Sequence, residues 1–164
     1  MKIFLILAVI LIFSTSPVIS QVVVPTKDRP TELERGVFGL GASIGLGTGM
    51  GISFRHHLPS ILSYQFTAGI IKDSKKLLYD VGLELQFDLV RAEKSRFFAG
   101  GGMGYYHKGD DENELNGPFR VAMGIGIETK IQEALHASGS LYFTYFTNGQ
   151  ILPLPQVGLH YYFF

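Results

Sequence analysis

The sequence predicts an all-β fold, an eight-stranded antiparallel up-and-down β-barrel that follows a cleavable N-terminal signal peptide. Apolar residues recur at every second position in eight separate stretches, which is the period of a β-strand. No stretch after the N-terminus shows a comparable i, i+3, i+4 helical stripe. The 20 Gly, 13 Phe and 8 Tyr residues also suit a β protein with one wholly apolar face.

The N-terminus has the organisation of a secretory signal peptide. Lys2 precedes an apolar run over residues 3–13 that is too short to span a bilayer, and the small-residue segment "STSPVIS" follows. Val18 and Ser20 occupy the third and first positions before the expected cleavage site. We therefore expect a signal peptide at 1–20, a periplasmic leader at 21–35 and a barrel at 36–164. A buried N-terminal helix is the alternative, but nothing later in the chain is patterned to cover it.

Composition excludes several classes of protein. The 14 Lys plus Arg balance 14 Asp plus Glu, so there is no basic face for nucleic acid. The chain has no Cys, which excludes disulfides and thiolate metal sites. An exported protein of this size without disulfides depends on hydrogen bonding and packing for its stability.

The first four strands are expected at 38–46, 50–58, 62–70 and 77–90. "FGLGASIGL" alternates apolar residues with Gly and Ser, and "MGISFRHHL" follows the turn "GTG". "LSYQFTAGI" comes after "PS", and "LLYDVGLELQFDLV" after the turn around "KDSKK". This fourth strand has apolar groups on one face and Asp80, Glu84 and Asp88 on the other.

The last four strands are expected at 97–105, 119–128, 135–145 and 157–163. "FFAGGGMGY" opposes apolar residues to glycines, and "FRVAMGIGIE" follows a long polar loop. "LHASGSLYFTY" and "VGLHYYF" place histidines, serines and tyrosine on the second face. Strands of this length are close to what is needed to cross a membrane at a tilt.

Alternation alone does not distinguish a lipid-facing barrel from a soluble barrel with an apolar interior. The lysines do, because all of them fall in the signal peptide, the leader, the turns or the strand ends. The polar face is instead mostly Gly, Ser and Thr, which suits the narrow interior of eight strands. Aromatic residues gather at both strand ends, as at two membrane interfaces: Tyr79, Tyr105, Phe119 and Tyr145 at one, and Phe38, Phe87, Phe97, Tyr161 and Phe163 at the other.

Loop lengths are expected to be asymmetric, with short connections near "LPS", "RAEKS" and "KIQEA" on the periplasmic side. The longest connections, "HKGDDENELNG" and "TNGQILPLP", are both expected on the outer side. Together these features predict a transmembrane barrel.

The chain resembles the small eight-stranded outer-membrane β-barrel proteins of Gram-negative bacteria over essentially all of residues 36–164. The C-terminal segment "VGLHYYFF" is similar to the aromatic signal that the outer-membrane assembly machinery reads. The resemblance implies that Val157, Leu159, Tyr161 and Phe163 carry this signal in phase with the apolar face. Phe164 lies one residue beyond that phase, so either Phe163 or Phe164 takes the terminal role.

The same phase predicts a polar network inside the barrel. Its expected members are Arg55, His57, Asp80, Glu84, Gln86, Asp88, Arg120, Glu128, His136 and His160. We expect Arg120 to contact Asp80 or Glu84 and Arg55 to contact Asp88 or Glu128, because an unpaired interior charge is costly. Such a network leaves little room for a pore.

Four short motifs point to other activities, and each has a simpler structural interpretation. Adjacent His56 and His57 point to opposite faces and do not form a metal site together. His136 and Ser138 share a face and resemble the His-x-Ser pair of some outer-membrane lipid A deacylases, but Gln150 stands where that family's orienting acid is expected. "GASIGLGTG" lacks the helix of a nucleotide-binding loop, and "GDDENE" lacks the spacing of an EF-hand.

The sequence therefore predicts a non-enzymatic outer-membrane barrel without a cofactor, with a structural or interaction role in the cell envelope. Its expected partners are outer-membrane lipid and lipopolysaccharide, the assembly machinery, and an envelope protein that the sequence does not name. The alternatives are a lipid A-modifying hydrolase and a narrow pore for small solutes.

Overall fold

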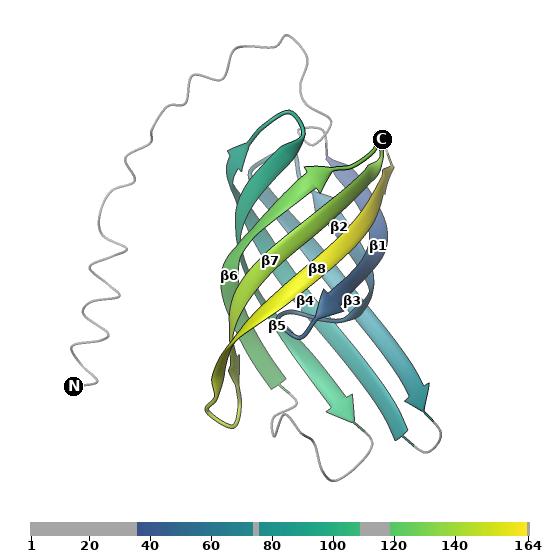
Figure 1. The fold of residues 1–164 in the computed structure, drawn as a ribbon, viewed down its shortest axis with the longest axis vertical. Helices are drawn as coiled ribbons and strands as arrows, with labels where there is room; N and C mark the ends of the chain where they lie inside the picture. Colours follow the sequence, from purple (N-terminus) through teal and green to yellow (C-terminus); the bar gives the residue numbers. More distant parts are fainter. Residues whose placement is uncertain (1–35, 74–75, 109–118, 164) are drawn as a thin grey trace, which may run out of the picture.

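A computed structural model describes residues 36–73, 76–108 and 119–163. They form a closed barrel of eight antiparallel strands in which each strand pairs with the next and β1 pairs with β8 (Figure 1). The strands are β1 (Val37–Gly45), β2 (Gly51–His57), β3 (Leu62–Asp73), β4 (Lys76–Arg91), β5 (Ser95–Lys108), β6 (Phe119–Lys130), β7 (Leu135–Phe146) and β8 (Ile151–Phe163). The predicted fold class is confirmed for this part of the chain.

Several predicted features lie outside the described residues. These are the signal peptide at 1–20, the leader at 21–35, most of the acidic loop and Phe164. Within the described ranges, no helix is both long and apolar enough to cross a membrane.

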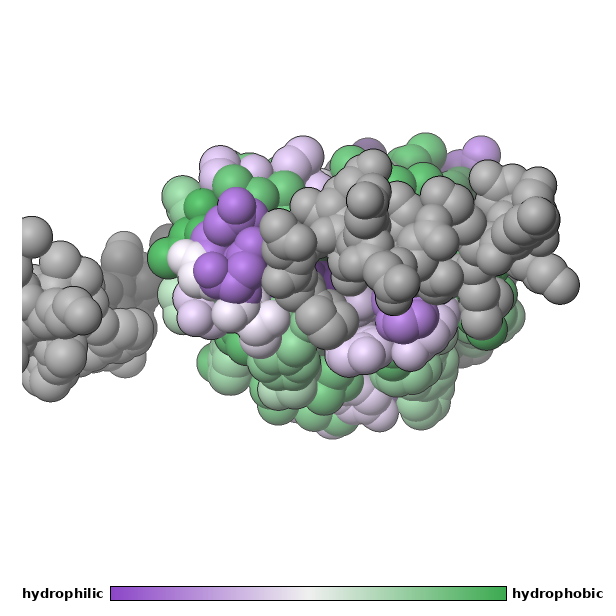
Figure 2. Space-filling view, turned by 90° about the horizontal axis from the view of Figure 1, so that it is seen from below, coloured by the Kyte–Doolittle hydropathy of each residue, from purple (hydrophilic) through white to green (hydrophobic). Residues whose placement is uncertain are grey.

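The apolar face of each strand points out of the barrel and the polar face points in. On β4, Leu83 and Leu85 are 42% and 44% exposed, whereas Glu84 between them is 2% exposed. In the view onto the end opposite the C-terminus, hydrophobic residues lie along the outer edge of the barrel (Figure 2). An exterior of this kind requires a surrounding that is itself apolar, because soluble proteins rarely expose large continuous apolar surfaces.

The connection between β1 and β2 folds into the barrel at the end opposite the C-terminus. Gly47, Thr48 and Gly49 of this inserted turn (residues 46–50) are buried. Gly49 has a φ of 158° and Gly51 a φ of 137°, and a side chain on Gly51 would meet the Ala68 carbonyl at 2.2 Å. The "GTG" segment therefore both turns the chain and fills the lumen.

The prediction of a long outer loop over residues 147–155 is wrong, because β8 already begins at Ile151. A tight turn at residues 147–150 connects β7 to β8, with Gly149 at a φ of 89° and the Phe146 amide donating to the Gln150 carbonyl at 2.9 Å. Pro153 and Pro155 made this segment look like a loop, yet both pair with β7. Proline is accommodated because β1 stops at Gly45, opposite Gln156, so this part of β8 is a sheet edge.

We predict that Gly82→Ala destabilises the barrel by displacing the inserted turn. A Cβ atom at Gly82 would stand 1.5 Å from the Thr48 carbonyl oxygen, so the turn and the added methyl group cannot occupy the same space. The measurement is the unfolding temperature in detergent, followed by the shift in gel migration on heating. Gly101→Ala is the control, because its Cβ would meet only the Ala122 carbonyl at 3.7 Å. Equal unfolding temperatures for the two variants would contradict the inserted position of the turn.

Candidate functional site

The barrel interior is the most densely bonded polar region of the described chain. The polar residues expected to face inward are all buried there: Arg55, His57, Asp80, Glu84, Gln86, Asp88, Arg120, Glu128, His136 and His160. They form two clusters, one around Glu128 toward the end where β1 begins and β8 ends, and one around Glu84 beneath the inserted turn.

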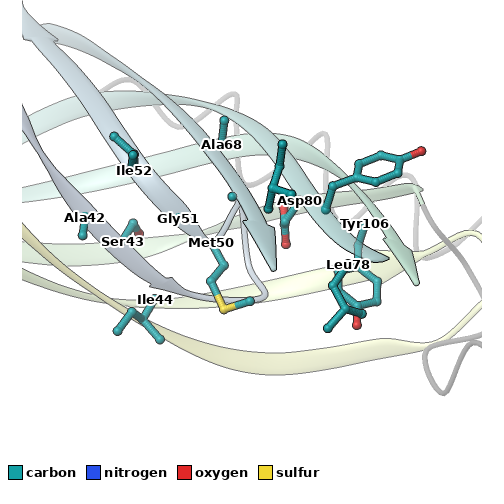
Figure 3. A pocket seen from close by; sticks show the side chains of 13 residues that line it. Ala42, Ser43, Ile44, Met50, Gly51, Ile52, Ala68, Leu78, Asp80 and Tyr106 are labelled. Atoms are coloured by element: carbon teal, nitrogen blue, oxygen red, sulfur yellow. The ribbon is translucent and has the colours of Figure 1, made fainter. Parts of the chain in front are cut away.

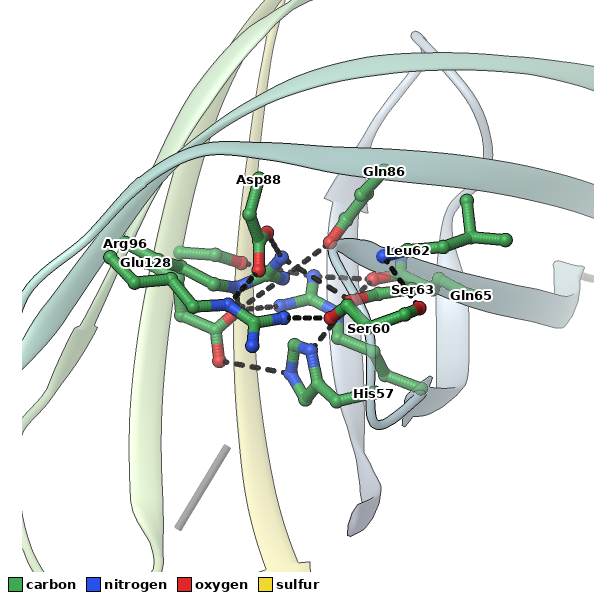
Figure 4. Close-up of polar contacts among 12 residues, drawn as sticks. His57, Ser60, Leu62, Ser63, Gln65, Gln86, Asp88, Arg96 and Glu128 are labelled. Carbon is green, nitrogen blue, oxygen red and sulfur yellow. Dashed lines mark hydrogen bonds and ion pairs between the residues drawn. The ribbon is translucent and has the colours of Figure 1, made fainter. Parts of the chain in front are cut away.

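Glu128 on β6 is the centre of the first cluster (Figure 4). Its Oε2 atom accepts hydrogen bonds from Arg55 Nη1 at 2.6 Å, and from Arg96 Nη2 at 2.6 Å and Nε at 2.9 Å. Its Oε1 atom accepts from the Tyr162 hydroxyl at 2.7 Å and lies 3.2 Å from His136 Nδ1. One carboxylate thus links side chains from β2, β5, β7 and β8.

Arg96 extends this cluster to β4. Its Nη1 atom donates to Asp88 Oδ1 at 2.5 Å, and its Nη2 atom also donates to Gln86. Arg91 donates to the second Asp88 oxygen. Arg55 donates through Nε to Gln65 Oε1 at 2.8 Å. The guanidinium groups of Arg55 and Arg96 therefore each contact acceptors on more than one other strand, which suits their planar set of donors.

The second cluster lies nearer the inserted turn. Arg120 Nη2 donates to both oxygens of Asp80, at 2.7 and 2.8 Å, and Arg120 Nε donates to the Gly47 carbonyl at 3.3 Å. Of the two partners that the sequence left open for Arg120, the structure gives Asp80. This pair also ties β4 and β6 to the inserted turn.

Glu84 is held by neutral groups. Thr48, Tyr142 and Gln86 donate to its carboxylate at 2.5 Å each, and Gln156 donates at 3.1 Å. Thr48 comes from the inserted turn, so the turn supplies a hydrogen bond that a bare lumen would lack. Several donors together stabilise a buried carboxylate where no ion pair forms.

The interior charges balance by sign. Arg55, Arg91, Arg96 and Arg120 stand against Asp80, Glu84, Asp88 and Glu128. A buried charge without a partner costs several kcal/mol, on the order of 3–5 kcal/mol when one member of a pair is removed. The barrel can enclose this many ionised groups because each one has a charged partner or several hydrogen-bond donors.

His57 joins the first cluster through both of its ring nitrogens. Because Tyr162 uses its single proton on Glu128, His57 Nε2 must donate to the Tyr162 oxygen, which lies 2.7 Å away. His57 Nδ1 lies 2.7 Å from the Ser63 hydroxyl oxygen. His160 Nε2 lies 2.8 Å from the Ser53 hydroxyl.

Several members of the two clusters were missed from the sequence. Arg96, Thr48, Tyr142, Tyr162, Gln65 and Gln156 are all buried in the lumen. The expected fifth strand at 97–105 leaves Arg96 outside it, whereas β5 begins at Ser95 and Arg96 is in phase with inward Gly100, Gly102 and Gly104. That phase was the available signal. No sequence signal indicates Thr48, because the alternation of apolar residues in strands does not predict where a turn folds.

The residues considered for hydrolysis do not hydrogen-bond to one another, and His136 Nε2 has no hydrogen-bond partner among the described residues. His136 Nδ1 faces Glu128, and the Ser138 hydroxyl accepts from Arg55 Nη2 at 3.3 Å. Gln150 adjoins Phe146 at the far end of β7, which at the usual rise of 3.3 Å per residue is roughly 33 Å from His136. His56 stacks on Phe38 at 4.1 Å on the outer surface, away from His57.

The residues expected to carry the C-terminal signal point outward. Val157, Leu159, Tyr161 and Phe163 are 56%, 46%, 52% and 58% exposed. The Tyr161 and Phe163 rings lie 5.4 Å apart, and β8 pairs there with β1, with Phe163 opposite Phe38.

No protein-family model matches the chain, and no curated protein matches it. Among solved structures, it is similar to the de novo designed TMB2.3, with 16% identity over 77% of this chain and 93% of that one and a TM-score of 0.42. It is also similar to the outer membrane protein Ail of Yersinia pestis, with 12% identity, coverage of 78% and 98%, and a TM-score of 0.46. Acinetobacter baumannii CarO2 is a third, with 11% identity, coverage of 79% and 100%, and a TM-score of 0.36. These likenesses concern the fold alone.

We predict that Arg96→Met lowers the free energy of unfolding by about 3–5 kcal/mol, because it leaves Asp88 and Glu128 short of a buried charged partner. Urea unfolding of the refolded barrel in lipid vesicles measures this change. Lys94→Met in the neighbouring turn is the control, since its side chain is exposed, and it should change the free energy by less than about 0.5 kcal/mol. If Arg96→Met were as stable as Lys94→Met, the network would not be holding the barrel.

Proposed function

We propose that this chain is an integral outer-membrane β-barrel whose lumen is sealed by its own polar network and which has a structural or interaction role in the cell envelope. The observation that carries the proposal is the continuous apolar exterior. Large apolar side chains are exposed on every strand, among them Leu40, Ile52, Phe66, Leu85, Met103, Ile125, Phe143 and Leu159. Such a surface is stable in contact with acyl chains and aggregates in water.

Aromatic residues at the two ends of the exterior support this proposal. Tyr105 pairs with Phe119 and its ring lies 5.9 Å from that of Tyr79, so these residues follow one another around the outer end. At the other end, Phe38 and Phe163 pair across the β1–β8 seam. Amphipathic and aromatic rings favour the headgroup level of a bilayer.

The distribution of exposed charge also supports embedding in a bilayer. Within the described strands, the outward positions between the two groups of aromatic residues hold no Asp, Glu, Lys or Arg. The exposed Lys94 and Glu133 instead lie in the connections between strands. A charge in the middle of the outward face would have to be buried in hydrocarbon.

The sealed lumen favours a role that depends on the surface of the barrel rather than on passage through it. Arg96, Arg120, Tyr142 and Tyr162 are among the largest fully buried side chains, and they occupy the interior. The partners that we propose are outer-membrane lipid and lipopolysaccharide on the exterior, and the assembly machinery at the outward C-terminal residues. An envelope protein bound at the outer end is the proposed interaction partner.

We predict that Ile125→Arg lowers the stability of the barrel in phospholipid vesicles by about 2–4 kcal/mol, the cost of a charge near the bilayer midplane. Ile131→Arg is the matched control, because Ile131 has the same side chain and a similar exposure, 55% against 51%, but lies in the β6–β7 turn. Urea titration of both variants measures the difference. A water-facing exterior would give equal stabilities, and that result would contradict the proposed location.

A further inference from the structure

A depression in the barrel wall lies beside the inserted turn (Figure 3). It has a volume of about 460 Å³. The wall is lower here, because β1 ends at Gly45 and β2 begins at Gly51. The neighbouring β3 and β4 extend further, since β3 ends at Asp73 and β4 begins at Lys76. The depression therefore opens where two short strands meet two long ones.

The lining of this depression is almost wholly apolar. Ile44, Ile52 and Ala68 contribute from the outward face of the barrel, and Met50, Leu78 and Tyr106 from the turn and the inward face of β4 and β5. Asp80 also borders it, but both of its carboxylate oxygens accept hydrogen bonds from Arg120. The site thus presents little unpaired charge to an occupant.

We propose that this depression binds one acyl chain of an outer-leaflet lipid. The inference rests on the proposed membrane location, and its support is continuity with the apolar exterior. Ile44, Ile52 and Ile70 at its edge are 65%, 70% and 77% exposed, so the same surface that faces the bilayer leads into the depression. A concave apolar site open to the bilayer is filled by the apolar group that surrounds it.

The lowered wall gives the acyl chain a defined path. From the lipid-facing Ile52 and Ala68, the lining passes the inserted turn at Met50 and reaches Leu78 and Tyr106 on the inner side of the taller wall. A chain in this position contacts protein on both sides of the step, unlike an acyl chain that only touches the convex exterior. Greater contact area should make this lipid exchange more slowly than its neighbours.

The methionines provide a test with internal controls. Met50 lines the depression, whereas Met103 and Met123 lie on the outward face and are 49% and 69% exposed. The barrel is labelled with ¹³C-methyl methionine, refolded in detergent and titrated with a phospholipid that carries a nitroxide on its acyl chain. We expect the Met50 signal to broaden first and to saturate at about one equivalent, and unlabelled lipid to restore it. Equal broadening of the three methyl signals would overturn the proposal.

Tryptophan substitutions test the site itself. Ala68→Trp fills the depression and should abolish the preferential broadening of Met50, and Ile44→Trp does so from β1 if Ala68→Trp does not fold. Ala99→Trp, on the outward face of β5 between Phe87 and Ile125, should leave it unchanged. Preferential broadening that survives in the filled variants overturns the proposal, as does a Met50 change that follows protein concentration, which would indicate a second copy. A barrel that inserts into vesicles without this preference refutes the acyl site and leaves the proposed location standing.

Discussion

Neutralisation of buried charge is the constraint on which the rest of this structure depends. An eight-stranded barrel with an apolar exterior must place its polar side chains in a narrow lumen, where an unpaired ion is expensive. Glu128 meets this constraint by binding Arg55 from β2 and Arg96 from β5, together with Tyr162 from β8. The backbone closes the barrel through hydrogen bonds between neighbouring strands. Arg96 and Glu128 lie opposite each other on such a pair, whereas Arg55 and Tyr162 connect β6 to strands that are not its neighbours.

The two ends of the lumen satisfy this constraint differently. Around Glu128 the neutralising groups come from strands alone, so the positions of the donors are fixed by the closed sheet. Around Glu84 a donor comes from Thr48 in the inserted turn, and Arg120 contacts both Asp80 and the Gly47 carbonyl. The inserted turn is therefore part of the network, and the short β1 and β2 strands that allow it also create the depression in the wall.

The two-residue period was enough to predict the fold and the faces, because side chains of a strand alternate strictly and one face of this barrel is apolar throughout. Strand ends were harder. Arg96 on β5 pairs with Arg91 on β4, next to a register shift between Asp88 and Val90 where two consecutive β4 residues face outward. Strict alternation does not extend through this region, so the expected fifth strand begins only at its first apolar residue. The last strand is expected only from Val157, whereas β8 begins at Ile151. The difference arises because its prolines lie on a sheet edge, which the sequence alone does not indicate. Which acid Arg120 binds depends on strand register, which alternation does not specify.

The most direct test of the central claim measures which side of the strands meets lipid. The chain has no Cys, so single nitroxide labels can be attached after Val81→Cys, Leu83→Cys, Leu85→Cys and Phe87→Cys along β4, with Glu133→Cys in a turn as the reference. Collision rates with oxygen, which concentrates in hydrocarbon, and with a water-soluble nickel complex are then compared in vesicles. The account predicts high oxygen and low nickel accessibility at the four strand positions and the reverse at the turn. High nickel accessibility at the strand positions would contradict it.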